Sequence, residues 1–128
     1  MTRVVGLDHV QVAAPPGCER EARRFYGELL GLKEIEKPEA LRSRGGVWFE
    51  CGGQQLHLGV EEPFSPARKA HPALNVESVA QLEELAARLG DGVIWDADLP
   101  GFKRFYVSDP FGNRLELLSR TGATGTTD

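Results

Sequence analysis

Four side chains able to bind a metal ion recur at a nearly regular interval along the chain. His71 follows His9 by 62 positions, and Glu116 follows His57 by 59 positions. The three histidines are all that the protein contains. Neutral imidazole nitrogen and carboxylate oxygen bind Zn²⁺ at about 2.0 to 2.2 Å, and this ligand set also suits Ni, Co, Mn and Fe. We therefore expect these four residues to bind one divalent ion that leaves positions open for a small-molecule substrate.

The surroundings of these residues repeat as well. The difference of three positions between the two intervals fits a longer loop at residues 13–17 in the first half. A repeat of this length indicates two copies of one supersecondary unit, each with two of the predicted ligands. The matches at an offset of 59 are Leu30-Gly31 with Leu89-Gly90, Gly53 with Gly112, and Leu56 and Leu58 with Leu115 and Leu117.

The first half has the apolar periodicity of a βαβββ module over about residues 4–60. Its helix is predicted at residues 18–30, where apolar residues recur at helical spacing, and Gly31 is placed to end it. A Cys-Gly-Gly turn at residues 51–53 connects the last two strands as a hairpin. The predicted strands are residues 4–13, 32–37, 46–50 and 54–60.

The same pattern restarts after a connector at residues 61–70 that contains two prolines. Ser78 and Gln81 have the spacing of a helix-capping box, and Gly90 is placed to end the helix that follows. The second module is predicted to cover about residues 71–119, followed by a small, polar tail at 120–128. Its predicted strands are residues 71–76, 93–95, 103–108 and 114–118, with the last hairpin turn at 109–113.

Alternation along the strands places every predicted ligand opposite an apolar face, because successive side chains of a strand point to opposite sides. Val10 and Val12 oppose His9, Leu56 and Leu58 oppose His57, Leu74 and Val76 oppose His71, and Leu115 and Leu117 oppose Glu116. We therefore expect an α+β fold with helices on the outside of the sheet and a polar, concave site on its inside.

A structural role is the alternative for each of these residues taken alone. A single histidine in a strand is more often a hydrogen-bonded structural residue than a ligand, and Glu116 alone could be solvated or ion-paired. Four such residues at equivalent places of two repeats favour a shared metal site. His57 is the one that a catalytic site could lack, because three protein ligands suffice.

Composition and charge limit the class of protein. A chain of 128 residues with 41% apolar content fits one domain, residues 1–128. Its net charge of −4 argues against a nucleic-acid or anionic-membrane surface, and no apolar run approaches the roughly 20 residues of a membrane helix. We expect no signal peptide, because residues 1–3 lead directly into a strand-like segment. Cys18 and Cys51 lack metal-binding spacing, so free thiols in a cytoplasmic protein are expected rather than a disulfide.

Five short motifs carry a family resemblance over about residues 4–119. The most specific is residues 106–117, with the sequence YVSDPFGNRLEL, which ends beside Glu116. The others are Leu7-Asp8-His9-Val10, Phe25-Tyr26 with Leu29-Leu30-Gly31-Leu32, Gln55-Leu56-His57-Leu58-Gly59 and His71-Pro72-Ala73-Leu74. Together they resemble the vicinal oxygen chelate superfamily of glyoxalases, bleomycin resistance proteins and dioxygenases.

The resemblance implies two βαβββ modules that form a curved mixed sheet around a cavity with a metal ion in it. His9 and His71 match the ligand positions on the first strand of each module, and His57 and Glu116 match those on the last strand. All four positions are filled in members of the glyoxalase and epimerase type. In that family the position of His57 is more typically Glu or Gln, so the departure here leaves Glu116 as the candidate catalytic base.

The activity implied is that of a metal-dependent lyase or isomerase, which moves a proton next to a metal-bound carbonyl of a small oxygenated substrate. The resemblance also implies a homodimer. Two other functions stay open. One is an extradiol-type dioxygenase with Fe(II) on His9, His71 and Glu116. The other is a protein of the bleomycin-resistance type that binds a drug or small ligand without chemistry, although such members generally lack the metal ligands.

Overall fold

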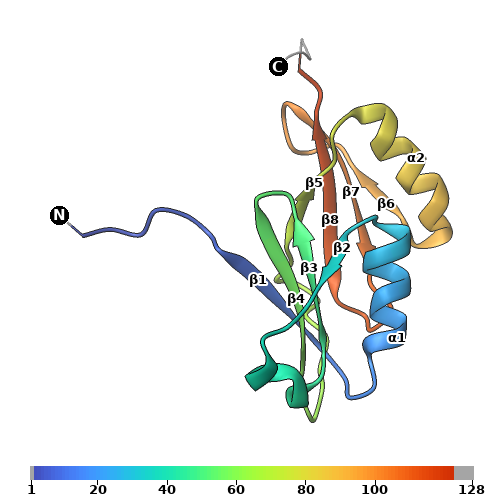
Figure 1. The fold of residues 1–128 in the computed structure, drawn as a ribbon. Helices are drawn as coiled ribbons and strands as arrows, with labels where there is room; N and C mark the ends of the chain where they lie inside the picture. The colour runs from blue at the N-terminus through green and yellow to red at the C-terminus, as the bar shows by residue number, and fades with distance from the viewer. Residues whose placement is uncertain (1, 123–128) are drawn as a thin grey trace. The chain divides into compact units, whose positions relative to one another are not determined.

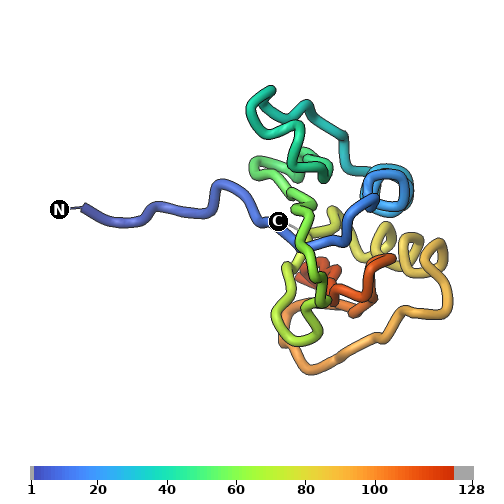
Figure 2. The backbone as a smooth tube through the Cα atoms, turned by 90° about the horizontal axis from the view of Figure 1, so that it is seen from below, coloured from blue at the N-terminus to red at the C-terminus, as the bar shows by residue number. Residues whose placement is uncertain are grey.

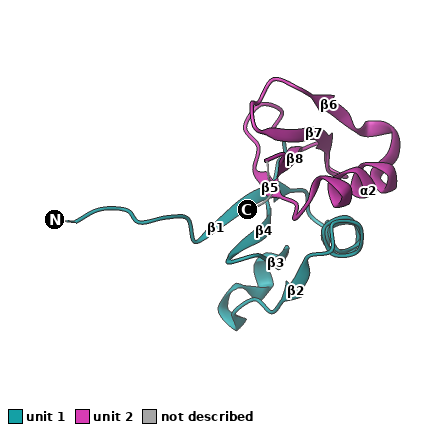
Figure 3. Ribbon diagram, turned by 90° about the horizontal axis from the view of Figure 1, so that it is seen from above, with its two compact units in different colours: residues 1–65 teal, residues 66–128 magenta. Residues whose placement is uncertain are grey.

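The chain forms two compact units, residues 1–65 and residues 66–128 (Figure 3). The computed structural model describes residues 2–122. Unit 1 contains, in order, β1 (His9–Ala14), α1 (Glu19–Ala22), the π-helical η1 (Arg23–Leu29), β2 (Lys33–Ile35), the 3-10 helix η2 (Glu39–Arg44), β3 (Val47–Cys51) and β4 (Gln54–Val60). Unit 2 contains β5 (Ala73–Asn75), α2 (Val79–Leu89), the 3-10 turn η3 (Gly90–Gly92), β6 (Ile94–Asp96), β7 (Phe102–Ser108) and β8 (Arg114–Arg120).

The two units have the same sheet topology, as the internal repeat predicts. The strand order is β1-β4-β3-β2 in the first sheet and β5-β8-β7-β6 in the second. The first strand of each module runs parallel to the last, and the remaining pairs are antiparallel. The predicted pair of βαβββ modules with mixed sheets is therefore confirmed.

In each unit, a helix and the apolar side of the sheet form the core. In unit 2, α2 contacts β7 and β8 and lies along one face of the sheet (Figure 1). Its buried side chains Leu82 and Leu85 recur at helical spacing. On β8, the buried side chains Leu115 and Leu117 recur at strand spacing. Burying a side chain of this size contributes about 1.5 to 3 kcal/mol. In unit 1 the helix contributes Phe25 and Tyr26, and it contacts β2 and β3.

The helix ends follow the sequence signals. The Ser78 hydroxyl accepts a hydrogen bond from the Gln81 amide at 3.1 Å, as expected for the first residue of a cap. Gly31 and Gly90 follow the two helices with φ of +79° and +81°, a backbone conformation that glycine adopts without a steric penalty. The predicted helix limits are therefore confirmed, although the first helix changes from α to π geometry at Arg23.

The first strand is shorter than predicted. Residues 4–8 lie outside β1, and the backbone before His9 runs away from the rest of unit 1 (Figures 1 and 2). Its partner β4 explains the limit, because the parallel register begins with His9 opposite Gln55. An alternating apolar sequence forms a strand only where a neighbouring strand accepts its hydrogen bonds.

Other strand limits also differ from the prediction. The strand predicted at residues 71–76 is confined to Ala73–Asn75, so His71 lies just before it. The last strand continues to Arg120, where a polar tail was predicted to begin at residue 120, and residues 123–128 of that tail lie outside the described residues. Among residues 2–122, no helix has the length and apolar character needed to cross a bilayer.

Candidate functional site

His71 and Glu116 lie in direct contact in unit 2. His71 Nε2 is 2.9 Å from Glu116 Oε1. The strand register brings them together: Ala73 is opposite Glu116, and the Glu116 amide donates to the Pro72 carbonyl at 3.1 Å. Glu116 is only 5% exposed, so this carboxylate is held largely away from water. The contact agrees with the prediction that these two residues share a face of the sheet.

The other nitrogen of His71 determines what can lie between the pair. Nδ1 is 2.9 Å from the Lys69 carbonyl, which can only accept, so Nδ1 carries a hydrogen. Nε2 and the carboxylate oxygen then both present lone pairs unless a cation, such as a proton, lies between them. Two ligand atoms of one divalent ion lie roughly 2.8 to 3.6 Å apart for bonds of 2.0 to 2.2 Å. The 2.9 Å separation therefore fits a metal-binding pair.

Arg104 is a third member of this cluster, and it is not among the site residues predicted from the sequence. Its Nη1 donates to Glu116 Oε2 at 3.0 Å, and its Nε donates to Asp96 Oδ2 at 2.7 Å. The two carboxylates raise the pKa of the guanidinium, and the hydrogen bond from Arg104 lowers the pKa of Asp96. The register of β6 and β7 places Asp96 opposite Arg104, and the sequence alone does not specify this pairing. Arg104 thus binds Oε2 of Glu116, while Oε1 of the same carboxylate is directed toward His71.

His57 in unit 1 has a different environment. Its ring is 3% exposed and stacks on Trp48, with centroids 3.7 Å apart and planes at 2°. The His9 ring lies 4.3 Å from it at 19°. His57 Nε2 is 2.9 Å from Gln55 Oε1, so it donates to that amide oxygen. Burial lowers the pKa of His57, with a smaller contribution from His9, and both favour the neutral ring.

His9 resembles His71 more than it resembles His57. Its Nδ1 is 2.9 Å from the Asp8 carboxylate, and the side chain is 45% exposed. An acceptor at Nδ1 fixes the tautomer and leaves Nε2 as the metal-binding nitrogen, which is the usual arrangement around histidine ligands. Among residues 2–122, no hydrogen bond involves Nε2 of His9. The contacts of His9 therefore fit a metal ligand that would bind through Nε2.

The third strand of each module carries an aromatic residue opposite a predicted ligand. Trp48 is opposite His57, and Tyr106 is opposite Glu116 at the same place of the second register. The Tyr106 ring lies edge-on to His71 with centroids 5.4 Å apart. An offset of 58 between Trp48 and Tyr106 was the available signal.

Each unit thus brings together two of the four predicted ligands. Within residues 2–122, no group of three or more His, Cys, Asp or Glu side chains is placed to hold a metal ion. Cys18 and Cys51 form no disulfide, as expected, and burial raises the pKa of both thiols.

Solved structures with this fold include proteins of several activities. A Bacillus anthracis protein assigned to the glyoxalase family is 52% identical, with a TM-score of 0.89 over 94% of this chain and 99% of that chain. The lactoylglutathione lyase of Agrobacterium tumefaciens is 22% identical, with a TM-score of 0.69 over 92% and 96%. The fosfomycin resistance protein FosX of Listeria monocytogenes is 17% identical, with a TM-score of 0.68 over 94% of both chains. These last two likenesses concern the fold alone.

The sequence comparison agrees with the structural one. No curated protein matches the chain significantly. The family model that matches covers residues 6–117, which include most of both modules and all four predicted ligands. The chain therefore belongs to the Glyoxalase/Bleomycin resistance protein/Dioxygenase superfamily.

Proposed function

We propose that the protein is a metal-dependent lyase or isomerase of the glyoxalase type, acting on a small molecule with a carbonyl group. The observation that carries the proposal is the 2.9 Å contact between His71 Nε2 and Glu116 Oε1. In the neutral ring both atoms present lone pairs, both belong to side chains oriented by a further hydrogen bond, and their separation suits ligands of one ion.

In this proposal His9 and His71 bind a divalent ion of Zn, Ni, Co, Mn or Fe through Nε2, and Glu116 binds it through its carboxylate. The ion supplies Lewis-acid polarisation of the substrate carbonyl. His57 is the proposed fourth ligand, and its Nε2 would have to exchange the hydrogen bond to Gln55 for the ion.

Glu116 is the proposed catalytic base. A carboxylate can remove a proton from the carbon next to a carbonyl and return it to a neighbouring atom. The hydrogen bond from Arg104 restricts the rotation of Glu116, so the carboxylate keeps one orientation while the proton moves. The Agrobacterium tumefaciens relative, a lactoylglutathione lyase, offers a first test compound.

The proposal is tested by hydrogen exchange next to a carbonyl. The full chain loaded with Zn²⁺ or Ni²⁺ is incubated in D₂O with lactoylglutathione and a panel of small carbonyl compounds, and proton NMR follows loss of the signal at the adjacent carbon. We expect exchange with at least one compound, its loss in Glu116→Gln, and its retention in Glu50→Gln, an exposed carboxylate on β3.

Other results would favour the rival functions. Oxygen consumption with a catechol by the Fe(II)-loaded protein would replace the proposal with a dioxygenase. Tight binding of a panel compound without exchange or oxygen uptake, in both the metal-free and the metal-loaded protein, would indicate a binding protein of the bleomycin-resistance type.

We also propose that the protein is a cytoplasmic homodimer. The segment before β1 exposes three apolar side chains close together: Val4 (90%), Val5 (92%) and Leu7 (74%). A group of exposed apolar side chains commonly marks a surface that a partner covers. In the described part of the chain β1 has one neighbouring strand, β4, so its other edge is available to a second copy. The unpaired cysteines support a reducing compartment.

Light scattering after gel filtration tests the dimer. We expect Val5→Ser with Leu7→Ser to shift the mass from two chains toward one. Ile94→Ser, which removes an apolar side chain that is 66% exposed on β6, should leave it unchanged. A wild-type chain that is monomeric at micromolar concentration would contradict the dimer.

A further inference from the structure

Arg114 lies on the same face of the unit 2 sheet as Glu116, because it precedes Glu116 by two residues on β8. Its guanidinium carbon is 3.9 Å from the centre of the Tyr106 ring. Tyr106 is opposite Glu116 in the β7–β8 register, and its ring centre is 5.4 Å from that of His71. The guanidinium of Arg114 is therefore separated from the His71 ring by no more than these two distances together.

The Arg114 guanidinium has no anionic partner in the described part of the chain. It forms no ion pair and no hydrogen bond there, although the side chain is half-buried. The equivalent position of unit 1 differs, because Gln55, two residues before His57, hydrogen-bonds to the His57 ring at 2.9 Å. Contact with the face of the Tyr106 ring leaves the N–H groups at the edge of the guanidinium free to bind two oxygens of one anion.

The charges around the proposed metal ligands of unit 2 also favour an anion at this place. Arg104 binds the carboxylates of Asp96 and Glu116 at 2.7 and 3.0 Å. With Arg114 included, two positive side chains balance two negative ones. A divalent ion bound by His71 and Glu116 would leave this group of charges positive. An excess of one sign attracts a ligand of the other.

We propose that Arg114 binds a carboxylate of the substrate, so that the substrate of the proposed enzyme is an oxo acid. This inference rests on the proposed function, which places the substrate carbonyl at the ion bound by His71 and Glu116. Arg114 donates two hydrogen bonds to the carboxylate, and Tyr106 supports the guanidinium in the orientation for them. In this account Arg114 determines which substrate binds and is not a metal ligand.

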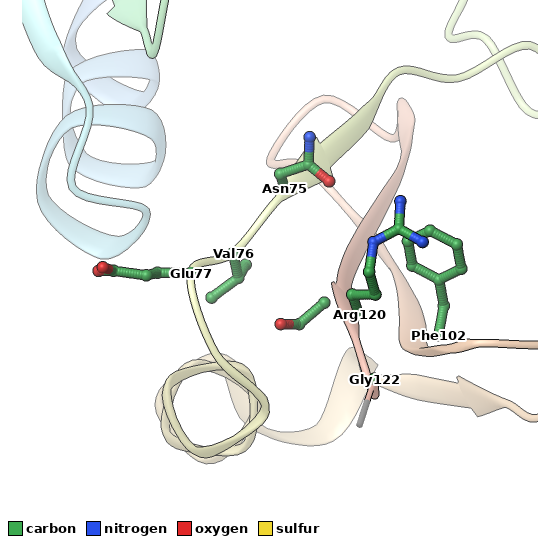
Figure 4. A pocket seen from close by; sticks show the side chains of 7 residues that line it. Asn75, Val76, Glu77, Phe102, Arg120 and Gly122 are labelled. Carbon is green, nitrogen blue, oxygen red and sulfur yellow. The ribbon is translucent and has the colours of Figure 1, made fainter. Parts of the chain in front are cut away.

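Arg120 provides a matched control on the same face of the sheet. Its guanidinium is 4.6 Å from the centre of the Phe102 ring, beside an open pocket where β5 and β8 end. The two side chains lie side by side in Figure 4. Arg120 is exposed and lies four residues beyond Glu116, roughly 13 Å along an extended strand. Removing its charge therefore tests a general effect of charge without the direct contact proposed for Arg114.

Binding of matched acids and esters to the Zn²⁺-loaded full chain tests the proposal. The probes are pyruvate, whose carbonyl and carboxylate are adjacent, and levulinate, in which two methylene groups separate them. Isothermal titration compares each acid with its methyl ester. We expect at least one acid to bind roughly tenfold or more tightly than its ester, as for a charge-assisted pair of hydrogen bonds. Arg114→Gln should remove most of this preference, Arg114→Lys should keep part of it, and Arg120→Gln should leave it unchanged.

Titration of the same variants with Zn²⁺ separates this inference from the proposed function. An unchanged Zn²⁺ affinity in Arg114→Gln would show that the variant is folded and that Arg114 acts on the substrate. Three results would overturn the inference alone if the wild type binds Zn²⁺: no binding of either acid, equal binding of acids and esters, or a wild-type preference in Arg114→Gln. A wild type that does not bind Zn²⁺ would overturn the proposed function and this inference with it.

Discussion

The two units have the same strand order and register, yet their predicted ligand pairs are built on different chemistry. In unit 1 the His57 ring stacks between His9 and Trp48, and no acidic side chain within residues 2–122 hydrogen-bonds to His57. In unit 2 the His71 Nε2 atom lies 2.9 Å from Glu116 Oε1, and Arg104 donates a hydrogen bond to the other carboxylate oxygen. A repeated backbone therefore does not imply a repeated site, because a few side chains decide what each copy can bind.

The different contacts of the two ligand pairs indicate that they contribute unequally to the proposed metal binding. The unit 2 pair presents a nitrogen and an oxygen lone pair to the same point, where a divalent ion can replace a proton. In the unit 1 pair, His9 has its Nδ1 on Asp8 and its Nε2 available, whereas Nε2 of His57 is already a donor to Gln55. We expect metal affinity to depend most on unit 2 and on His9, and least on His57.

The largest effect is expected from Glu116→Gln. The substitution keeps the size of the side chain and removes the charge that neutralises the ion, so metal affinity should fall by more than about 100-fold. Isothermal titration with Zn²⁺ measures the change, and Glu50→Gln is the matched control. Equal affinities of the two variants would show that unit 2 does not bind the ion.

A smaller loss is expected from Arg104→Gln. This residue does not bind the ion in our account but orients Glu116, and removing such a partner typically weakens metal binding by about 10- to 100-fold. The same titration measures it. Arg114→Gln serves as the control, because Arg114 stacks on Tyr106 at 3.9 Å without a hydrogen bond to Glu116 among the described residues. A loss as large in Arg114→Gln would mean that general charge, and not orientation, is responsible.

The stacked rings of His9, His57 and Trp48 in unit 1 should affect the stability of the protein more than its metal binding. Trp48→Leu removes the ring that lies 3.7 Å from His57, and aromatic pairs contribute about 0.5 to 1.5 kcal/mol beyond their buried area. Urea unfolding should show a decrease of at least this size in the free energy of unfolding, while Zn²⁺ affinity changes little. A large loss of affinity with unchanged stability would instead place Trp48 in the metal site.

The smallest effect is a pH dependence from His57. Burial lowers its pKa in the folded state below the usual 6.5, so the unfolded chain binds the proton more readily. Its contribution to stability is therefore complete above pH 6.5 and decreases as the pH falls toward the lower, folded-state pKa. Urea unfolding of the metal-free protein at pH 5 and pH 8 should show a smaller difference in His57→Phe than in the wild type. An unchanged difference would mean that another group causes the dependence.

Much of this arrangement could be predicted from the sequence, because it follows from local rules. Alternation along β8 places Glu116 opposite Leu115 and Leu117, and the helix caps at Ser78 and Gly90 depend on neighbouring residues only. The repeat of 59 to 62 positions then predicts that the same topology occurs twice. These inferences need no knowledge of which strands pair.

The rest depends on pairing, which composition and periodicity do not specify. The segment before His9 has the alternation of a strand, but β4 offers it no partner there. Arg104 lies two residues along β7 from Tyr106, and its contact with Glu116 arises from the β7–β8 register. The stack of Trp48 on His57 arises in the same way from the β3–β4 register.

His71 and Glu116 are expected to form the main part of the proposed metal site. Native mass spectrometry of the full chain, purified untagged and without chelator, counts bound ions in the wild type and in four single alanine variants. We predict one ion per chain in the wild type, none in His71→Ala, Glu116→Ala and His9→Ala, and partial retention in His57→Ala. A chain that neither retains nor rebinds a divalent ion, or one that loses its ion only in His57→Ala, would show that His71 and Glu116 do not form this site.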